Sequence, residues 1–463
     1  MDQLADQVRR AASRSNGSVV ADRHTALTSG EAVRRADEVA AQVRALSARG
    51  DPRVAVMLPN SLDAVVHLLA AVLGGYCVGF IDPTAQGDKV PAVLDAMDPD
   101  VVVDGAGMRA RERRTDRLQR PGYVAMSSGS TGGPPKGVLS TWECLADFVP
   151  HGADALQLDA SACWAEPSHP AYDLAMTNWL LALSSGASLH VSSSLADRLR
   201  PLALGARVGA THVRLAPRFV DLAAGEADRG AVATVRVWAS GGDRLVPAQA
   251  ERILGLGVGT LVNTYGTSET GGFASAATFT SVDQVRSLHG SVTVGRGAVG
   301  PWRLEVLPDD GTGRQAEMLA VRSPHLGDGY LFGGEGLDHP RWEPGRVITG
   351  DHGTQVEDDL FCFGRSGRLV KRSASFVNLD DVDLVLRDQQ GLATYTVATR
   401  GGALVTLVEA ATLELEGVRE RLAATVAPDV VPDALVHVAR LPRLGNGKTD
   451  QAGAVRLAEQ VLE

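Results

Sequence analysis

The sequence predicts an α/β protein whose larger, N-terminal part is built on parallel-rich βαβ sheets. Two observations carry this prediction. Short apolar runs of strand length alternate with segments of helical periodicity through the first two-thirds of the 463-residue chain, and this is the pattern of βαβ units. With 44% hydrophobic and 22% charged residues, the chain has an ordinary globular composition, and its length fits two or three domains.

The first elements follow this alternation one after another. Strands are expected at 53–57, 76–81 and 100–104. Helices are expected between them at 61–73, with Ser61 as the N-cap, and at 90–97. Further strands are expected at 211–215, 234–239 and 260–263, each close to a turn or a helix start. This order predicts that the parallel sheet continues with helical crossovers.

The last third of the chain has a different pattern. Short strands punctuated by glycine at 294–306 and 317–322 predict a small β subdomain, and Arg341–Gly345 is expected to be a turn. The polar segment 364–368 is predicted to link an N-terminal core, residues 1–363, to a small α+β C-terminal domain, residues 369–463. Strands at 404–408 and 434–439 and a helix at 413–426 are expected in that domain.

Composition and charge exclude several classes of protein. The formal net charge of −10 argues against a nucleic acid or an anionic membrane held by bulk electrostatics. The sequence shows neither a bilayer-length apolar run nor a signal peptide, so a cytoplasmic location is expected. The four cysteines are far apart and lack the spacing of zinc ligands, so they are expected to be reduced packing residues.

Residues 127–137, Ser-Ser-Gly-Ser-Thr-Gly-Gly-Pro-Pro-Lys-Gly, form the most informative segment. Hydroxyl donors and glycines together suit a polyphosphate, which needs many short donors and a backbone free to approach it. Lys136 adds a compact positive charge. A Walker loop is excluded because no Ser or Thr follows this lysine. The segment therefore predicts a phosphate-binding loop of another kind, with an ordinary surface loop as the alternative.

Lysine is scarce in this chain. Lysine and arginine together number 45, yet lysine occurs only at positions 89, 136, 371 and 448. Because arginine fills the general surface charge, a remaining lysine favours a role that needs a compact ammonium group. Three of the four lysines lie in motif-like segments.

Four more segments follow the loop in a fixed order. They are Asn263–Glu269 (Asn-Thr-Tyr-Gly-Thr-Ser-Glu), Thr349-Gly350-Asp351, Gly364-Arg365, and Leu441-Pro442 through Gly447-Lys448. With the loop, this series resembles the motifs of the adenylate-forming enzymes, which comprise acyl-CoA synthetases, luciferases and the amino-acid adenylation domains of nonribosomal peptide synthesis. The resemblance covers most of the chain and is closest to a free-standing amino-acid adenylation enzyme. It implies ATP and Mg²⁺ as cofactors and a C-terminal domain that is mobile about the hinge 364–368.

The resemblance also implies individual roles for the motif residues. Lys448 would contact the substrate carboxylate and the α-phosphate, Ser268 would bond the α-phosphate, and Lys371 would serve the thioester-forming half-reaction. Glu269 would bind Mg²⁺, for which an oxygen ligand is suitable. The residues expected to hold the nucleotide are Ser127, Ser128, Gly129, Ser130, Thr131, Gly132, Lys136, Gly241, Gly242, Asp243, Thr264, Tyr265, Gly266, Asp351 and Arg365.

Three departures from the family pattern affect these expectations. Two residues, Gly133-Pro134, stand between the last loop glycine and Pro135-Lys136, where the family usually has one. Gly367 stands at the hinge position that is commonly Asp or Lys, and Ala374 replaces a usual glycine. The last change concerns the tunnel for a pantetheine thiol rather than the adenylation step.

The segment Pro167–Ala175 resembles the part of the family that lines the acid pocket. Asp173 would pair with the α-ammonium group of an amino acid, and its alternative role is to cap the helix that follows. Alignment to the family places further residues around the substrate: Tyr172, Leu174, Thr177, Arg214, Trp238, Ser240, Thr264, Gly272 and Phe273. Because a buried unpaired guanidinium is costly, Arg214 favours an acidic substrate such as aspartate or a relative. A small neutral amino acid, with Arg214 paired to a protein carboxylate, is the alternative.

The acceptor of the activated acid is expected to be a thiol. The chain ends soon after Lys448, so the expected acceptor is the phosphopantetheine arm of a separate carrier protein, in natural-product biosynthesis such as that of an antibiotic. One alternative is an acyl-CoA ligase, in which Arg365, Arg368 and Arg372 would contact the 3′-phosphate of coenzyme A. A second alternative is a non-catalytic ligand-binding protein on the same fold.

Overall fold

The computed structural model describes most of the chain. It describes all residues except 1, 16, 85–88, 116–119, 128–135, 221–228, 297, 309–316, 325, 327–328, 334–339, 366–367, 373–374, 391, 400, 411–414, 424–429, 444–448 and 463. The internal contacts divide the chain into two compact units. Unit 1 comprises residues 1–127, 135–349 and 353–362, and unit 2 comprises residues 128–134, 350–352 and 363–463. The final change of unit, at Phe363, lies one residue before the predicted hinge.

An eight-stranded sheet forms the centre of unit 1. Its order is β14 (Ser275–Phe279), β13 (Thr260–Tyr265), β12 (Val237–Gly241), β11 (His212–Leu215), β9 (Cys163–Glu166), β10 (Ser188–Val191), β1 (Val19–Ala21) and β2 (Ala26–Thr28). Only the two edge strands, β14 and β2, run antiparallel to their neighbours. The six strands between them are parallel, as the alternating sequence pattern predicts.

A second, seven-stranded sheet in unit 1 contains the earliest predicted strands. Its order is β20 (Tyr330–Phe332), β8 (Lys136–Thr141), β7 (Gly122–Ser127), β4 (Cys77–Phe80), β3 (Arg53–Val56), β5 (Val101–Asp104) and β6 (Gly107–Ala110). Strands β7 and β8 form an antiparallel hairpin in which Ser127 is in register with Lys136. The predicted phosphate loop therefore connects two paired strand ends.

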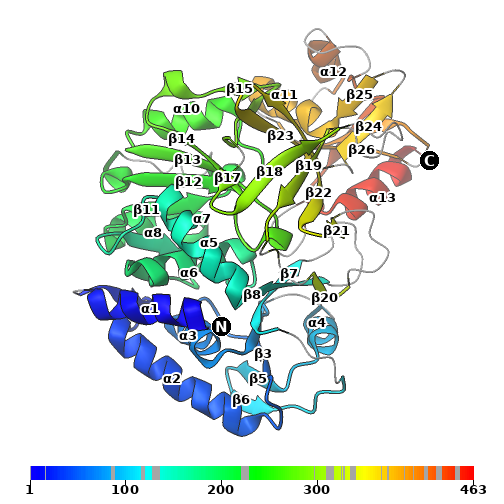
Figure 1. Cartoon of the computed structure of the whole chain (residues 1–463). Coiled ribbons are helices and arrows are strands. Elements are labelled where there is room, and N and C mark those ends of the chain that lie inside the picture. The colour runs from blue at the N-terminus through cyan, green and yellow to red at the C-terminus, as the bar shows by residue number, and fades with distance from the viewer. Residues whose placement is uncertain are drawn as a thin grey trace. The chain divides into compact units, whose positions relative to one another are not determined.

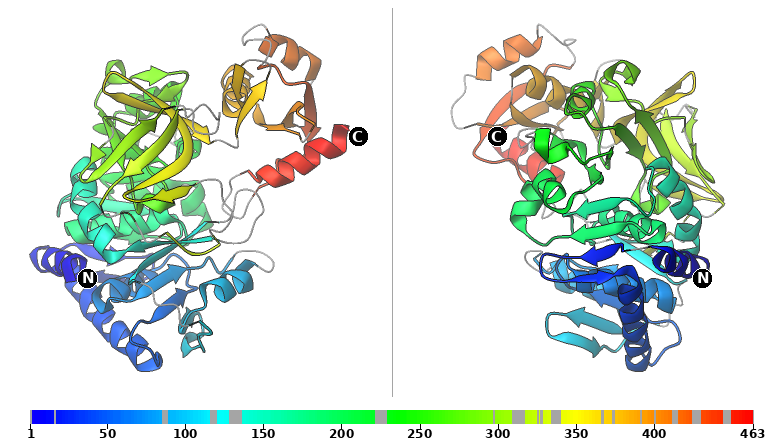
Figure 2. Two further views of the ribbon diagram at one scale, coloured as in Figure 1. Left: turned by 45° about the vertical axis from the view of Figure 1, so that its right-hand side comes forward. Right: turned by 90° about the vertical axis from the view of Figure 1, so that its left-hand side faces the viewer.

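Helices cover both faces of the eight-stranded sheet. The helices of unit 1 are α1 (Asp2–Arg14), α2 (Ser29–Leu46), α3 (Leu62–Gly74), α4 (Lys89–Met97), α5 (Trp142–Ala155), α6 (Asp173–Ser185), α7 (Leu195–Leu199), α8 (Pro201–Val208) and α10 (Pro247–Gly255). The main core joins apolar residues of α1, α3, α5 and α6 to both sheets, and the N-terminal helices lie beside the seven-stranded sheet (Figures 1 and 2). A second core on the other face of β11–β13 includes residues of α8 and α10. Coverage on both sides explains why β11, β12 and β13 are buried along their whole length.

Local sequence signals account for individual helix ends. The Ser61 hydroxyl accepts a hydrogen bond of 3.3 Å from the Ala64 amide, so it caps α3 as predicted. Gly75 and Gly186, which follow α3 and α6, adopt left-handed conformations that glycine tolerates at little cost.

A third sheet of unit 1 corresponds to the predicted β subdomain. Its strands are β17 (Ala298–Val299), β18 (Trp302–Leu307), β19 (Met318–Arg322), β22 (Arg346–Val356), β21 (Arg341–Glu343) and β23 (Asp359–Arg365). Unit 1 also contains the two-stranded ribbon β15 (Ser287–Leu288) and β16 (Ser291–Val292) and the short 3₁₀ helices η1 (Pro217–Phe219), η2 (Arg229–Val232), η3 (Ser268–Thr270) and η4 (Val282–Gln284).

The prediction of a turn over Arg341–Gly345 is wrong for its first three residues. Arg341–Glu343 form strand β21, which pairs antiparallel with β22. Only Pro344 and Gly345 make the turn, and Gly345 has a φ of 73°. The pairing of Trp342 with Val347 across the hairpin outweighs the local turn signal, because aromatic and β-branched partners stabilise paired strands.

Unit 2 is a small α+β assembly. A two-stranded ribbon, β24 (Leu369–Arg372) and β25 (Ser375–Asn378), precedes a three-stranded sheet of β26 (Ala393–Ala398), β27 (Leu404–Glu409) and β28 (Ala434–Val438). Its helices are α11 (Leu379–Gln390), α12 (Leu415–Ala423) and α13 (Gln451–Leu462). Val405 and Leu407 pack with α13 residues, whereas Leu404 packs with residues of α11 and α12, so both faces of β27 are covered. The predicted fold class, α/β with parallel-rich sheets and a small α+β C-terminal part, is confirmed.

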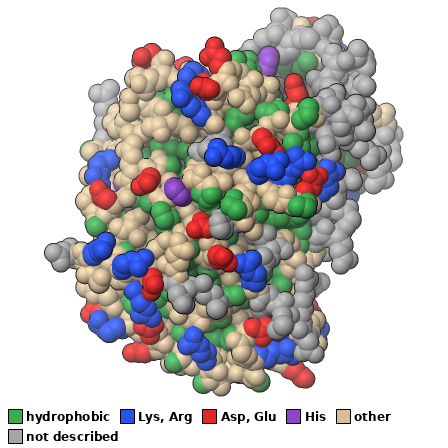
Figure 3. All heavy atoms as spheres, in the orientation of Figure 1, with side chains coloured by type: hydrophobic (Ala, Val, Ile, Leu, Met, Phe, Trp, Pro, Cys, Tyr) green, Lys and Arg blue, Asp and Glu red, His purple; other side chains and the backbone are tan. Residues whose placement is uncertain are grey.

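The surface of unit 1 is of mixed charge. Figure 3 shows basic and acidic side chains alternating across the described part of one face, with hydrophobic side chains scattered among them. Within the described residues, none of the helices combines the length and the apolar character that crossing a membrane requires.

Candidate active site

The candidate site lies near the carboxyl ends of the parallel strands β9, β11, β12 and β13. In open parallel sheets this edge is the usual location of a ligand crevice. Arg214 is the third residue of β11, and Thr264 is the fifth of β13. Helix α6, which packs in the same core as these strands, begins at Asp173. Three of the residues that the sequence predicts for the acid pocket are therefore carried by adjacent elements.

Asp173 is the first residue of α6, and its carboxylate is linked to the predicted metal-binding motif. Its Oδ2 accepts a hydrogen bond from the Ser268 hydroxyl on η3, and its Oδ1 accepts one of 2.7 Å from the Leu174 amide. Tyr172, and not Asp173, occupies the N-cap position. Asp173 is therefore not the N-cap residue of α6, although its Oδ1 accepts from one of the first amides of the helix. Thr177, one turn further, donates to the Asp173 carbonyl at 2.8 Å.

Arg214 is buried, with 6% of the residue exposed. Its Nη1 donates to Asn178 Oδ1 at 3.3 Å, and its Nη2 donates to Thr264 Oγ1 at 3.0 Å. Both acceptors are neutral. Among the described residues, its Nε has no hydrogen-bond partner. The guanidinium carbon also lies 5.0 Å from the centroid of the Phe273 ring, within the range of a cation–π contact.

The electrostatics of Arg214 show an incompletely compensated charge. Burial lowers its pKa to about 10, although the nearby carboxylates of Asp173 and Glu166 act in the opposite direction. The side chain is still protonated at neutral pH, because its pKa remains far above that range. Since burial outweighs both carboxylates, this position favours an additional anion.

We call Arg214 and the side chains around it, Asp173, Glu166, Asn178 and Thr264, the pocket group. Phe273 and Gly272 lie on one side of it. The Phe273 ring packs edge-on against Phe148, with centroids 5.1 Å apart, and Phe148 packs against Trp302 at 5.7 Å. A Cβ added at Gly272 would lie 2.7 Å from the Phe148 ring, so a side chain there would force the aromatic cluster to move. Leu174 is partly exposed at the start of α6.

The structure does not bring Trp238 and Ser240 together with Arg214. Arg214 is in register with Ala239, and Gly241 with Thr264, so these four residues point to one face of the sheet. Trp238 packs on the opposite face with apolar residues of α8 and α10. The family alignment assigns Trp238 and Ser240 to the pocket, whereas the structure places their side chains on the other face, because successive side chains of a strand point to opposite faces. Ala239 and Gly241 are the residues of β12 that face the pocket group.

Gly241 is in close contact with this group. A Cβ at Gly241 would lie 2.2 Å from Thr264 Oγ1 and 3.3 Å from Arg214 Nη2. Gly242 has a φ of 79°, a left-handed conformation that glycine favours. Asp243 is exposed, and its Oδ1 accepts from the Arg244 amide at 2.9 Å.

The motif Tyr265–Glu269 follows β13 directly. Glu269 is 7% exposed and its Oε1 accepts a hydrogen bond of 2.8 Å from the Tyr330 hydroxyl. The Tyr265 hydroxyl donates to Thr349 Oγ1 at 3.1 Å, which connects this motif to the strand that carries the Thr-Gly-Asp segment. A Cβ at Gly266 would lie 2.2 Å from the Gly272 carbonyl oxygen, so the chain turns tightly between the two predicted pocket segments.

Several predicted site residues lie outside the described part of the chain. These are the loop residues Ser128, Gly129, Ser130, Thr131 and Gly132, and the catalytic candidate Lys448. Ser127, Lys371 and Arg365 lie on β7, β24 and β23, but their side chains are not described. Lys136 begins β8, and Asp351 lies on β22 with 6% exposed.

Two residues of the pocket group were not predicted from the sequence. Glu166, at the end of β9, is 1% exposed, and Asn178 on α6 is fully buried. Asn178 Nδ2 donates to Glu166 Oε2 at 2.5 Å while its Oδ1 accepts from Arg214. The sequence contained a signal for both: Glu166 stands at the end of an apolar run, and Asn178 stands inside another. Charged and amide side chains are uncommon in such buried runs.

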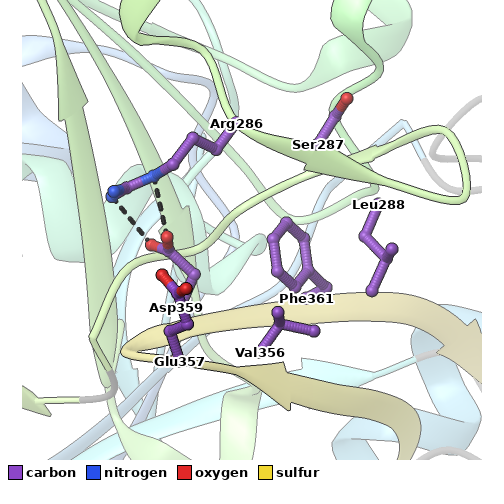
Figure 4. A pocket seen from close by; sticks show the side chains of 7 residues that line it. All are labelled: Arg286, Ser287, Leu288, Val356, Glu357, Asp359 and Phe361. Carbon is purple, nitrogen blue, oxygen red and sulfur yellow. Dashed lines mark hydrogen bonds and ion pairs between the residues drawn. The ribbon is translucent and has the colours of Figure 1, made fainter.

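Other potential sites in the described part of the chain are distinct from this one. None of its residues form a group of three or more His, Cys, Asp or Glu that could hold a metal ion. An open groove of about 330 Å³ is lined by β15, the preceding Arg286 and the β22–β23 hairpin, and Arg286 and Asp359 form an ion pair across it (Figure 4). The residues that line it include none of the predicted site residues.

Comparison with known proteins identifies the family. A family model described as "AMP-binding enzyme" matches residues 8–121 and 109–331, more than half of the chain. The chain belongs to the AMP-binding enzyme family. The predicted resemblance to adenylate-forming enzymes is thereby confirmed, and ATP is the nucleotide that such enzymes use. The matched residues include Asp173, Arg214 and Glu269.

The curated relatives of this AMP-binding enzyme include nonribosomal peptide synthetases. A probable nonribosomal peptide synthetase of Salinispora arenicola is 27% identical over 95% of the chain, which covers 6% of that protein. An isonitrile lipopeptide synthase of Streptomyces coeruleorubidus is 27% identical over 89% of the chain, which covers 30% of that protein. The chain thus spans less than a third of the length of these relatives. Adenylation of the type found in nonribosomal peptide synthesis is the activity that these relatives support.

Solved structures show the same fold across the superfamily. O-succinylbenzoate coenzyme A synthetase from Bacillus subtilis, in complex with AMP, has a TM-score of 0.80 at 17% identity, covering 96% of this chain and 97% of that one. A four-domain nonribosomal peptide synthetase bound to AMP and glycine has a TM-score of 0.77 at 21% identity, covering 96% of this chain and 36% of that one. Enzymes that use coenzyme A and enzymes of peptide assembly therefore share this fold, so the fold alone leaves the acceptor open.

Proposed function

We propose that this enzyme activates an acidic amino acid, aspartate or a close relative, as the aminoacyl-AMP and transfers it to the phosphopantetheine thiol of a separate carrier protein. One observation carries the proposal. The pocket group contains a carboxylate, Asp173, and a buried guanidinium, Arg214, that are not paired with each other within the described structure. An acidic amino acid has one group for each of them.

Asp173 is suited to the α-ammonium group of the substrate. Its Oδ2 is satisfied by a neutral hydroxyl, that of Ser268, in the absence of substrate. An ammonium group gives this carboxylate a charge-assisted hydrogen bond, which is about twice as strong as a neutral one. Fatty and aryl acids have no cation to place here, so Asp173 supports an amino acid.

Arg214 is suited to a side-chain carboxylate. Two neutral acceptors and an aromatic ring surround it, and burial outweighs the influence of both nearby protein carboxylates. A short acidic side chain would provide the missing negative charge and bidentate acceptors that match a guanidinium. The Phe148–Phe273 aromatic pair limits the length of the side chain that fits. Tyr172, Leu174, Thr177 and Gly272 are the further residues that we propose to surround it.

The proposed nucleotide site follows the order of motifs along the chain. We propose that Ser127–Gly132 and Lys136 hold the β- and γ-phosphates, that Tyr265 and the segment 241–243 hold the adenine, and that Asp351 accepts the ribose hydroxyls. Among the described residues, the second oxygen of the Glu269 carboxylate has no hydrogen-bond partner, so this residue fits a Mg²⁺ ligand. When bound, Mg²⁺ neutralises charge on the phosphates.

The proposed chemistry has two steps. A carboxylate oxygen of the substrate attacks the α-phosphorus of ATP, and the bond to the bridging oxygen of pyrophosphate breaks. Lys448 would stabilise the negative charge that gathers on the α-phosphate oxygens, a contribution worth roughly 10²-fold or more in rate. In the second step, which we assign to the segment of Lys371, a thiolate attacks the acyl carbon and AMP leaves.

The comparisons support the amino-acid class and the carrier. The curated relatives that match most of the chain are synthases of peptides and lipopeptides, whose building blocks are amino acids. One observation disfavours the coenzyme A alternative. Arg368, one of three arginines proposed for the 3′-phosphate, is 7% exposed and bonded to Asp380 and Asp383. It is therefore not available to a phosphate in this arrangement.

ATP–pyrophosphate exchange across a panel of amino acids tests the substrate. We expect the highest kcat/KM with aspartate or a β-amino or methylated aspartate, and loss of exchange in Asp173→Asn for every amino acid. Strong exchange only with large apolar acids would refute the acidic pocket. Unchanged AMP-ester formation in Lys448→Ala would instead favour a non-catalytic protein.

A second experiment tests the acceptor. The activated acid is offered to free coenzyme A and, in parallel, to holo carrier proteins added in trans. Thioester formation on a carrier protein, detected by intact mass, is the expected result. Efficient transfer to coenzyme A alone would establish an acyl-CoA ligase.

A further inference from the structure

Glu166 and Asn178 connect Arg214 to a second buried charge. Arg214 donates to Asn178 Oδ1 at 3.3 Å, and Asn178 Nδ2 donates to Glu166 Oε2 at 2.5 Å. Arginine can only donate and a carboxylate can only accept, so the carboxamide between them has one possible orientation. The chain Arg214–Asn178–Glu166 is thus directional.

The sheet positions both charged ends of this chain. His212 of β11 is in register with Trp164 of β9, and Arg214 and Glu166 each lie two residues further along these parallel strands. The two side chains consequently extend from the same face of neighbouring strands. In spite of this, no ion pair joins them in the described structure, since Asn178 is interposed.

The hydrogen-bond donors around Glu166 favour its carboxylate form. Its Oε1 accepts from the Ser168 amide at 2.9 Å, and its Oε2 accepts from Asn178. Both oxygens face N–H donors, an arrangement that stabilises the ionised form. Burial raises the pKa of Glu166, and the same hydrogen bonds oppose this effect. Its backbone carbonyl is also fixed, because Asn60 Nδ2 donates to it at 2.9 Å.

We propose that Glu166 and Asn178 are positioning residues that make Arg214 selective for an anionic side chain. This inference rests on the proposed function. The interposed amide fixes the guanidinium by one hydrogen bond but keeps the protein's own counter-charge one residue away. Arg214 is thereby held in place without being neutralised, and the substrate carboxylate completes the pair. If Glu166 contacted Arg214 directly, the pocket would be satisfied without an anion and would prefer a neutral side chain.

A charge-conserving swap tests this inference. The double variant Glu166→Gln with Asn178→Asp keeps the net charge and keeps an amide-to-carboxylate hydrogen bond, but moves the carboxylate next to Arg214. The readout is the ratio of kcat/KM for aspartate to that for asparagine, two substrates of nearly equal shape. We expect the ratio to fall roughly 100-fold, because a site with a satisfied cation no longer gains from the substrate's charge.

The single variant Glu166→Gln is the matched control, with the opposite expectation. It is nearly isosteric and removes the distant counter-charge, so the aspartate-to-asparagine ratio should rise by roughly 10-fold. Thermal unfolding and AMP binding of both variants establish that they are folded. If both variants lost kcat/KM equally for aspartate and asparagine, the role of Glu166 and Asn178 would be merely structural, and the inference would be overturned.

The wild-type enzyme separates failure of the inference from failure of the proposed function. If the wild type activates no acidic amino acid, the proposed substrate class is refuted, and the inference falls with it. If the wild type prefers aspartate but the double variant retains the same ratio, only the inference is refuted. Opposite shifts of the ratio in the two variants would support both.

Discussion

Two buried arginines of this chain have opposite surroundings. Arg214 in unit 1 and Arg368 in unit 2 are 6% and 7% exposed, and each lies over an aromatic ring. Arg368 is bonded to the carboxylates of Asp380 at 2.8 Å and Asp383 at 2.5 Å. Arg214 is bonded to an amide and a hydroxyl.

The difference appears in their ionisation. Burial alone would lower both pKa values, but the two aspartates raise the pKa of Arg368 above its ordinary value, whereas the pKa of Arg214 falls to about 10. A buried cation that the protein has fully paired is part of the fold. A buried cation left with neutral partners indicates a place for a ligand, because the protein otherwise gains nothing from burying it.

Replacing Arg214 should give the largest effect and should act on activity alone. In Arg214→Leu we expect kcat/KM for aspartate to fall roughly 10³-fold, since a buried charge contact with substrate is lost. The free energy of unfolding should change little, because removal of a desolvated charge offsets the unpaired Asn178 oxygen. Pyrophosphate exchange and denaturant unfolding measure the two quantities. Arg214→Lys, which keeps a charge, should retain more activity than the leucine variant; equal activity of both would contradict the anion-binding role.

Replacing Arg368 should have the reverse effect. Arg368→Met removes the cation that is bonded to Asp380 and to the largely buried Asp383, so we expect unit 2 to lose about 3–5 kcal/mol of stability. Denaturant unfolding followed by limited proteolysis of the C-terminal segment measures this. Adding Asp383→Asn to the same variant should restore part of the loss. If Arg368→Met were as stable as the wild type, the pairing of Arg368 with its two aspartates would not contribute to the stability of unit 2.

The sequence predicted the strands that carry the site better than the side chains that complete it. Alternation and the Ser61 cap located β3, α3 and β4 within a residue or two, because these signals are local. The family alignment assigns Trp238 and Ser240 to the pocket, but the structure places their side chains on the opposite face of β12 from Arg214. A strand covered on both faces has no alternation that shows which residues face the pocket. The bond between Glu166 and Asn178 joins residues 12 apart on a strand and a helix, and only the packing of α6 on the sheet brings them together.

The burial of His212 on the pocket strand β11 should give a smaller effect, which appears in the pH dependence of the protein's stability. His212, two residues before Arg214, is 1% exposed, and burial lowers its pKa to about 4, with Arg236 acting in the same direction. Its unfolded-state pKa is about 6.5. As the pH falls below that value the unfolded chain gains a proton that the folded chain does not, so stability decreases until about pH 4.

We expect this histidine to cost about 2 kcal/mol of stability between neutral pH and about pH 5. In His212→Gln that part of the pH dependence should be absent. Urea unfolding of the wild type and the variant over this pH range gives the comparison. Parallel stability curves for the two proteins would contradict the assignment, while His67, whose pKa burial also lowers to about 4, should leave a residual slope in both.

The smallest change that tests the role of Arg214 is the addition of one methyl group at Gly241. A Cβ at this position would lie 2.2 Å from Thr264 Oγ1 and 3.3 Å from Arg214 Nη2, so Gly241→Ala must displace the hydroxyl that holds the guanidinium. Overpacking of this kind costs about 1–3 kcal/mol, and we expect about a 10-fold loss of kcat/KM for aspartate with a smaller loss for asparagine. Gly255→Ala is the matched control, because its Cβ would meet nothing within 4 Å and its backbone is helical. If Gly241→Ala lowered kcat/KM for aspartate and for asparagine equally, the methyl group would be disturbing the sheet in general. Arg214 would then not be the residue that selects the acid.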